Sequence, residues 1–217
     1  MTKVNRGNEN MTDITRLRVC LLLIALAVTP VLAAGDVEIN YDLNGPALND
    51  VCGLTAGNNA VFWAVGDQGK VFKIENGGII AEYTLEGGDY DLHGVSFADG
   101  DHGWIVGYKR YDPNDPDSWR KGVVFRTITG GGGSGAWTPS CPPVRDGINV
   151  PFLKVQAVNT NFVWVTCGDG YVLTSGDGGL NWNVVNKPGG AGDYSYLWGL
   201  WAFDGDRAWV ASDQSRA

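Results

Sequence analysis

The sequence has little positive charge, few histidines and, beyond its N-terminal part, no segment with a helical period. Of its 217 residues 18% are charged, acidic side chains outnumber basic ones by 24 to 16, and only two residues are histidine. Binding to nucleic acid or to anionic lipid relies on clusters of Lys and Arg, and no such cluster is visible. The composition therefore argues against a nucleic-acid partner.

Cysteine is also scarce. Apart from Cys20, which lies in an N-terminal apolar run, the chain contains Cys52, Cys141 and Cys167. Three cysteines allow at most one intramolecular disulfide, and their wide separations match no zinc-site spacing. We expect no metal and no cofactor, and the sequence leaves open whether any two of these cysteines pair.

The one long apolar run lies near the N-terminus. It follows Arg16 and Arg18 and ends at Val31-Leu-Ala-Ala34, which offers small residues for cleavage. A basic flank, an apolar core of about 7–15 residues and a small-residue exit are typical of a secretory signal, whereas a membrane-spanning helix needs roughly 20 apolar residues. The sequence predicts a signal peptide over residues 1–33, with Met11 as an alternative start. Export would place the protein in the periplasm, outside the cell or on its surface, with the signal as its only membrane contact.

Glycine and tryptophan are abundant instead, with 32 and 9 residues, and tryptophan marks a repeat. Four tryptophans each follow an aliphatic residue by nine positions, after a turn rich in Asn, Asp and Gly. The pairs are Leu54 and Trp63, Val95 and Trp104, Val155 and Trp164, and Leu200 and Trp209. Such turn residues tolerate a positive φ and suit tight hairpins. The four tryptophans are predicted to be buried against neighbouring units.

Each unit is predicted to contain four strands, with an insertion at residues 108–120 in the second unit. Four strands that recur after about 40–45 residues have the period of a β-propeller blade. The sequence therefore predicts an all-β fold, a β-propeller of about three and a half blades. After a leader at 34–48, the blades are expected at residues 49–88, 89–150, 151–192 and, truncated, 193–217.

The third unit contains Ser175-Gly-Asp-Gly-Gly-Leu-Asn-Trp182 between its third and fourth strands. This octet fits the Asp-box pattern Ser/Thr-x-Asp-x-Gly-x-x-Trp. The Asp177 carboxylate can accept backbone N–H groups that leave the strand ladder, and Gly179 can adopt conformations closed to other residues. The first unit has Asn76 at this place and the second has Thr129. A catalytic carboxylate is not expected to recur as Asn and Thr in sister repeats, whereas a turn-forming residue is. We therefore interpret four residues as structural: Ser175, Asp177, Gly179 and Trp182.

Blades with this pattern resemble the BNR/Asp-box propeller superfamily. Within it, three stretches look most like the photosystem II stability/assembly factor family and its relatives in non-photosynthetic bacteria. They are "LHGVSFADGDHGWIVG", "VVFRTITGG" and "GYVLTSGDGGLNW". The similarity covers about residues 49–217. It implies a non-enzymatic exported propeller that binds a protein partner across its face, which in the photosynthetic members is a reaction-centre subunit during assembly.

The chain departs from that family in two respects. The family propeller has about seven blades, so ring completion here requires either blades outside this sequence or other copies of the chain. A half-ring leaves strand edges unpaired, which favours aggregation. The family also binds its partner through a basic patch, and no arginine cluster is visible here. The resemblance therefore transfers no site residue.

Two further hypotheses rest on acidic residues. Oxygen ligands for Ca²⁺ lie close together in the insertion, without the spacing of an EF-hand; they are Asp112, Asp115 and Asp117. A glycoside hydrolase needs two facing carboxylates or, in sialidases, a tyrosine nucleophile with an arginine cluster. The candidate acids fall near turns or blade starts: Asp67, Asp89, Asp91 and Asp193. The histidines, His93 and His102, have no evident Ser or Cys partner.

The function expected from the sequence is thus an exported, non-catalytic propeller that binds a protein as an assembly scaffold. A sialidase-like or xyloglucanase-like glycoside hydrolase, with catalytic residues partly in missing blades, is one alternative. A cell-surface adhesion module is the other. No catalytic residue is predicted.

Overall fold

A computed structural model of the chain describes residues 16–18, 38–40, 45–56, 59–116, 118, 121–140, 150–185 and 196–213. The chain divides into two units, residues 1–46 and 47–217. In the first unit β1 (Arg16–Arg18) pairs antiparallel with β2 (Glu38–Asn40). The rest of the expected signal peptide lies outside the described residues. In the described part of the chain, no helix has the length and apolar character to cross a membrane.

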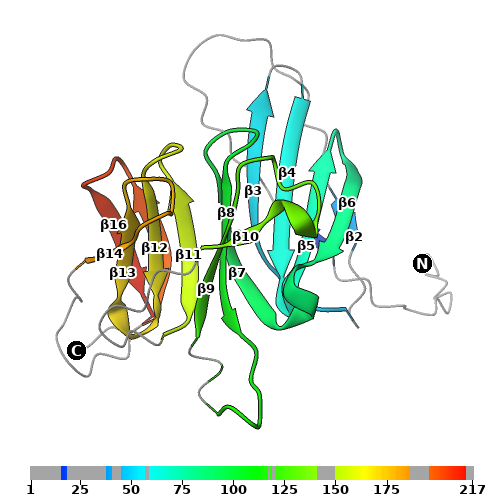
Figure 1. The fold of residues 1–217 in the computed structure, drawn as a ribbon. Coiled ribbons are helices and arrows are strands. Elements are labelled where there is room, and N and C mark those ends of the chain that lie inside the picture. The colour runs from blue at the N-terminus through cyan, green and yellow to red at the C-terminus, as the bar shows by residue number, and fades with distance from the viewer. Residues whose placement is uncertain are drawn as a thin grey trace, which may run out of the picture. The chain divides into compact units, whose positions relative to one another are not determined.

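The second unit consists of four antiparallel sheets, each built from strands that are consecutive in the sequence (Figure 1). Blade 1 contains β3 (Leu48–Ala56), β4 (Asn59–Gly66), β5 (Lys70–Glu75) and β6 (Gly78–Thr84). Blade 2 contains β7 (Tyr90–Phe97), β8 (Gly103–Lys109), β9 (Gly122–Thr127) and β10 (Thr138–Pro139). Blade 3 contains β11 (Phe152–Ala157), β12 (Val163–Cys167), β13 (Val172–Ser175) and β14 (Asn183–Val185). Blade 4 is a hairpin of β15 (Leu197–Ala202) and β16 (Ala208–Ser212).

The first strands of the blades lie against one another. Strand β7 contacts both β3 and β11, and β11 contacts β15, so these inner strands share one edge of the unit while the fourth strands form the opposite edges (Figure 1). Side chains bridge neighbouring inner strands by accepting backbone N–H groups. Asp50 accepts from Val95 at 3.0 Å, Ser96 from Ala157 at 3.0 Å, and Gln156 from Ala202 at 2.7 Å. The predicted all-β propeller with an incomplete last blade is confirmed.

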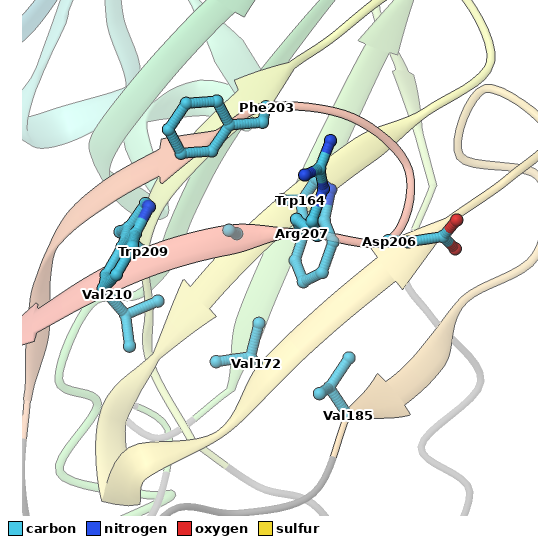
Figure 2. A pocket seen from close by; sticks show the side chains of 9 residues that line it. Trp164, Val172, Val185, Phe203, Asp206, Arg207, Trp209 and Val210 are labelled. Carbon is cyan, nitrogen blue, oxygen red and sulfur yellow. The ribbon is translucent and has the colours of Figure 1, made fainter.

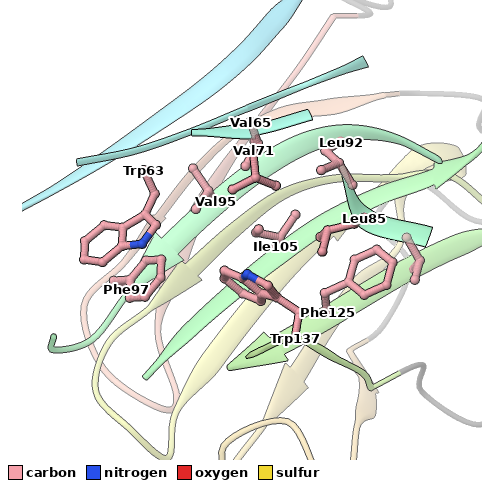
Figure 3. Close-up of a cluster of buried hydrophobic side chains, with 11 residues drawn as sticks. Trp63, Val65, Val71, Leu85, Leu92, Val95, Phe97, Ile105, Phe125 and Trp137 are labelled. Atoms are coloured by element: carbon pink, nitrogen blue, oxygen red, sulfur yellow. The ribbon is translucent and has the colours of Figure 1, made fainter. Parts of the chain in front are cut away.

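The hydrophobic core lies between neighbouring blades (Figure 3). Trp63 of blade 1 stacks on Phe97 of blade 2 with ring centroids 3.6 Å apart. Because successive side chains of a strand point to opposite faces, β8 contributes to two clusters. Ile105 packs towards blade 1, whereas Trp104 packs in the cluster shared with blade 3. Strand β8 therefore packs blade 2 against both of its neighbours.

Each buried repeat tryptophan also donates a hydrogen bond to the following blade. The acceptors are the carbonyl oxygens of Gly130 for Trp63 (3.2 Å), Gly178 for Trp104 (3.0 Å) and Asp204 for Trp164 (2.8 Å). The first two acceptors lie in the turn between the third and fourth strands, and the last lies in the β15–β16 turn. A buried indole N–H requires an acceptor, so the same residue fills the core and fixes a turn of the next blade.

Trp209 does not occupy a core position, contrary to the prediction. Its side chain is 70% exposed, whereas the exposed fraction is 1% for Trp63 and 0% for Trp104. The tryptophan of each earlier blade packs towards the blade that follows. Trp209 takes the equivalent place on β16, and no described strand covers that side of blade 4.

The spacing of nine residues is a structural repeat only in blades 2 to 4. There the aliphatic residue pairs with the residue after the tryptophan, as in Val95 with Ile105. In blade 1 the partner of Ala64 is Val51 and not Leu54. The β3–β4 hairpin continues further, and Leu54 pairs with Val61 instead. The match of the first unit at this spacing is therefore coincidental.

The turns between first and second strands also differ from the expectation of a positive φ. Among the described residues every positive φ lies elsewhere. In blades 2 to 4 a side-chain oxygen instead accepts two backbone N–H groups, which is the geometry of an Asx-turn. Asp99 accepts from Asp101 and His102, Asn159 from Asn161 and Phe162, and Asp204 from Asp206 and Arg207, all at 2.7–2.9 Å. The acidic and amide residues act here through their side chains.

Candidate functional site

All four inner strands carry a β-bulge at the same position. The register shifts by one residue between Leu48 and Asp50, Leu92 and Gly94, Phe152 and Lys154, and Leu197 and Gly199. The extra residues are Asn49, His93, Leu153 and Trp198. A bulge redirects side chains and is frequent beside functional sites. Leu153 is buried, whereas the other three are partly accessible.

Aromatic side chains of blades 2 and 4 meet at this end of the inner strands. His93 of β7 stacks on Tyr108 of β8, with centroids 4.7 Å apart and planes inclined by 16°. Trp198 of β15 lies 6.2 Å from His93 and stacks on Tyr196 at 5.9 Å. Because Trp198 is 43% exposed, these four rings form a surface that a partner can contact.

An ion pair beside these rings joins blades 1 and 3. Lys154 Nζ of β11 lies 2.9 Å from Asp50 Oδ1 of β3. The other carboxylate oxygen of Asp50 accepts the Val95 N–H. Both side chains are only about a quarter exposed, at 27% and 23%, so the pair is held in place from three blades.

Two further carboxylates lie at the same end. Asp67 belongs to the 3₁₀ turn η1 (Asp67–Gly69) and accepts a hydrogen bond from Asn49 Nδ2 at 2.7 Å. Asp91 of β7 lies 3.5 Å from Arg110 Nε and accepts the Gln68 N–H at 2.9 Å. Within the described residues, Asp67 makes no ion pair.

Burial controls the protonation of the central rings. It lowers the pKa of His93 below its usual value, and the carboxylates of Asp67 and Asp91 only partly oppose the shift. Burial also raises the pKa of Tyr108, and the same two carboxylates add to the rise. Both side chains are therefore uncharged at pH 7.

We use the name inner-end site for the rings and the charged groups around them. Its members are Asp50, Asp67, Asp91, His93, Tyr108, Arg110, Lys154, Tyr196, Trp198 and Asp213. Sequence analysis gave Asp67 and Asp91 as candidate acids near turns or blade starts and found no Ser or Cys partner for His93, and the structure brings these three residues to one end of the inner strands. Asp193 lies outside the described residues. One sequence signal could have located the bulges: His93, Leu153 and Trp198 each stand the same number of residues before a repeat tryptophan.

A groove of about 620 Å³ runs along β16 (Figure 2). Its walls include Trp164 and Val172 of blade 3 and Phe203, Trp209 and Val210 of blade 4. In blades 1 to 3 the second strand pairs with a third strand, whereas β16 pairs only with β15 among the described residues. The groove therefore corresponds to the place that a third strand takes in the other blades.

The turn at residues 175–182 is organised by its own side chains. Asp177 Oδ1 accepts the N–H groups of Leu180 (3.1 Å) and Asn181 (2.8 Å) and the hydroxyl of Ser175 (2.8 Å). Ser175 Oγ in turn accepts the N–H of Gly179 at 2.7 Å. Hydrogen bonds from the Asn181 backbone and side chain hold the pKa of Asp177 below its usual value. The carboxylate thus acts as an acceptor for a turn, in line with its structural interpretation.

Two glycines let this turn approach blade 2. Gly178 and Gly179 have φ values of 73° and 90°, a region that favours glycine. A Cβ on Gly179 would lie 2.9 Å from Trp104 Nε1. Trp182 is buried and donates its indole N–H to the Gly179 carbonyl at 3.1 Å.

The corresponding turns of blades 1 and 2 differ. In blade 2, Thr127 Oγ1 accepts the N–H groups of Thr129 and Gly131, both at 3.2 Å, as Ser175 does in blade 3. In blade 1, Asn76 and Gly77 form a two-residue hairpin turn with φ values of 49° and 81°, the pattern of a type I′ turn. The alignment of Asn76 with Asp177 was therefore wrong, because Asn76 contributes its backbone conformation.

The acidic insertion and the cysteines show no ligand geometry. Asp112 Oδ1 accepts the Asn114 N–H at 2.8 Å, Asp115 pairs with Lys121, and Asp117 lies outside the described residues. In the described ranges no three His, Cys, Asp or Glu side chains are grouped to hold a metal ion, so the calcium hypothesis gains no support. Cys52 and Cys167 are free thiols, and Cys141 is not among the described residues.

Comparisons with known proteins agree with the architecture. No protein-family model and no curated protein matches the chain. A solved structure described as "YCF48 bound to D1 peptide" is similar with a TM-score of 0.51 and 18% identity, over 71% of this chain and 43% of that chain. YCF48 from Cyanidioschyzon merolae is similar with a TM-score of 0.48 and 21% identity, over 65% and 40%. The chain thus spans less than half the length of either protein, and its blades have a YCF48-like β-propeller fold, as the resemblance to the photosystem II stability/assembly factor family implied.

Proposed function

We propose that the chain is an exported, non-catalytic propeller that binds a protein partner as an interaction or assembly scaffold. The observation that carries the proposal is the inner-end site, where blades 1, 2, 3 and 4 present aromatic and charged side chains together. Partly exposed aromatic residues beside paired charges are typical of protein interfaces. The site lies at strand ends and turns, where binding residues concentrate.

Two other observations support the proposal. A protein of this fold is described as bound to a D1 peptide, which makes peptide recognition a natural use of the blades. The basic flank and apolar run before residue 34 support export, because they have the pattern of a secretory signal. Fusing residues 1–40 to a reporter enzyme that is active only after export tests this second part.

Selection of binders from a random peptide display library tests the binding function. We expect enriched peptides whose binding is lost in Trp198→Ala. The matched control is Trp209→Ala, which removes a tryptophan that is still more accessible, 70% exposed against 43% for Trp198, and lies outside the inner-end site. If no peptide is enriched, or if both variants bind alike, the site does not bind proteins.

The glycoside hydrolase alternative is less well supported by the site. Among the described carboxylates of the site, Asp50 pairs with Lys154 and Asp91 lies near Arg110. Asp213 accepts two hydrogen bonds and Asp67 accepts one from Asn49, whereas a two-carboxylate mechanism needs two carboxyl groups that are available to the substrate. Turnover of aryl glycosides by the purified chain, abolished in Asp67→Asn, would overturn this assessment.

A further inference from the structure

We infer that the inner-end site binds a cationic side chain of the partner, an arginine or a lysine, against the ring of Trp198. The inference rests on the proposed function and adds the chemistry of the contacted residue. It follows from two independent features, the arrangement of the rings and the balance of charge around them.

The rings present faces that a cation can approach. The planes of His93 and Trp198 are inclined by 52° with centroids 6.2 Å apart, so these rings form adjoining walls and do not stack. Trp198 keeps 43% of its surface exposed. The face of an indole attracts ammonium and guanidinium groups through its quadrupole, more strongly than the other aromatic side chains do.

Carboxylates reinforce this preference. Asp213 anchors the rings, since its two oxygens accept the Tyr196 N–H at 3.1 Å and the Trp198 indole N–H at 3.4 Å. Asp67 makes no ion pair within the described residues, and Arg110 only partly compensates Asp91 because the pair is long and exposed. A cation on the Trp198 face therefore approaches uncompensated negative charge.

The basic groups of the site do not reverse this balance. Lys154 is committed to Asp50 at 2.9 Å, and Arg110 extends towards Asp91. At neutral pH His93 is uncharged, because burial lowers its pKa. Among the described residues of the site, four carboxylates (Asp50, Asp67, Asp91 and Asp213) face two basic side chains (Arg110 and Lys154), so an acidic side chain would meet net negative charge.

Titration of short peptides into the ¹⁵N-labelled full chain tests the inference. The probe is Ac-Gly-Gly-Arg-Gly-Gly-NH₂, and its counterparts carry norleucine or glutamate at the central position. The readout is the indole N–H resonance of Trp198, identified by its absence in Trp198→Phe. We expect saturable shifts with the arginine peptide and none with the other two. Equal binding of the glutamate peptide overturns the inference.

Charge variants sharpen the test. Asp67→Asn and Asp213→Asn should each weaken binding of the arginine peptide about two- to fivefold, the range of an exposed charge interaction. The control is Asp206→Asn, which changes an exposed carboxylate of the β15–β16 turn outside the site. Unchanged affinity in both site variants, with intact thermal unfolding curves, contradicts the assignment.

Failure of the inference and failure of the proposed function give different results. Display peptides that need Trp198 but lack Arg and Lys would sustain protein binding and reject the cationic contact. Saturable binding of the arginine peptide, without any enriched display peptide, would sustain the cationic contact and reject the scaffold function.

Discussion

The repeat tryptophans show that one residue type at one place in a repeat can have opposite environments. Trp104 is buried and hydrogen-bonded to the next blade, whereas Trp209, at the same place in blade 4, is 70% exposed. The difference lies entirely in what covers the side chain. The place of a tryptophan in the repeat therefore does not predict how much its side chain contributes to the free energy of unfolding.

Alanine substitutions at these two positions should diverge. Trp104→Ala removes a buried indole and should lower the free energy of unfolding by about 3–5 kcal/mol. Trp209→Ala should change it by less than about 0.5 kcal/mol, because an exposed side chain loses little on truncation. Urea denaturation followed by circular dichroism measures both, and equal losses would contradict the environments described here.

Asp177 should make stability depend on pH in a defined direction. Its pKa is lowered in the folded chain, so the unfolded chain binds more protons between the two pKa values. The stabilisation is present above the usual aspartate value of about 3.9 and is lost as the pH falls through the folded pKa. The stability difference between the parent and Asp177→Asn should therefore be larger at pH 6 than at pH 3, as measured by urea denaturation. A difference that grows towards low pH would contradict the sign.

At the scale of the element, strands were more predictable from the sequence than turns. The alternation of apolar residues and the spacing of Gly and Asn indicated four strands per blade. The bulges were missed, because the break that one extra residue such as His93 makes in a period-two pattern is hidden in a strand that is buried on both faces. Asp99 and its equivalents were assigned to the correct turns for the wrong reason, since Asp supports both an Asx-turn and a positive φ.

Two turns should respond differently to the loss of a glycine. Gly77 has a φ of 81° and open space around a Cβ, whereas Gly179 has a φ of 90° and Trp104 Nε1 in the way at 2.9 Å. Gly77→Ala should therefore cost only the backbone strain of about 1–2 kcal/mol. Gly179→Ala adds the displacement of a buried indole and should cost roughly 2–4 kcal/mol. Thermal unfolding of the two variants decides between them, and a larger loss in Gly77→Ala would be inconsistent with this packing.

At the scale of the whole molecule, blade 4 has accessible apolar side chains on both faces of its hairpin. Trp201, Phe203, Trp209 and Val210 are between 40% and 70% exposed, and β16 offers an unpaired edge among the described strands. The sequence indicated an unfinished last blade from its repeat. It could not indicate which side chains would be uncovered, because that depends on the direction in which each blade packs.

These side chains and the open edge of β16 should make the chain self-associate. An exposed apolar strand edge pairs readily with another chain, and an inserted lysine prevents such pairing. We expect a concentration-dependent increase in molecular mass in analytical ultracentrifugation, suppressed in Val210→Lys. Leu180→Lys, which changes an exposed leucine of a turn, should leave the association unchanged. A chain that stays monomeric at high concentration would contradict the expectation.

The hydrogen bonds from each tryptophan to the next blade all run from the N-terminal to the C-terminal side. A ribosome releases the chain in that same order, so the indole of each blade has its hydrogen-bond acceptor only after a further 67, 74 or 40 residues have been made. During synthesis the most recently made blade is therefore always the one with an exposed tryptophan. Among the described residues Trp209 is in this uncovered state, 70% exposed, and chaperones that recognise exposed aromatic residues should prefer blade 4 to the three blades before it.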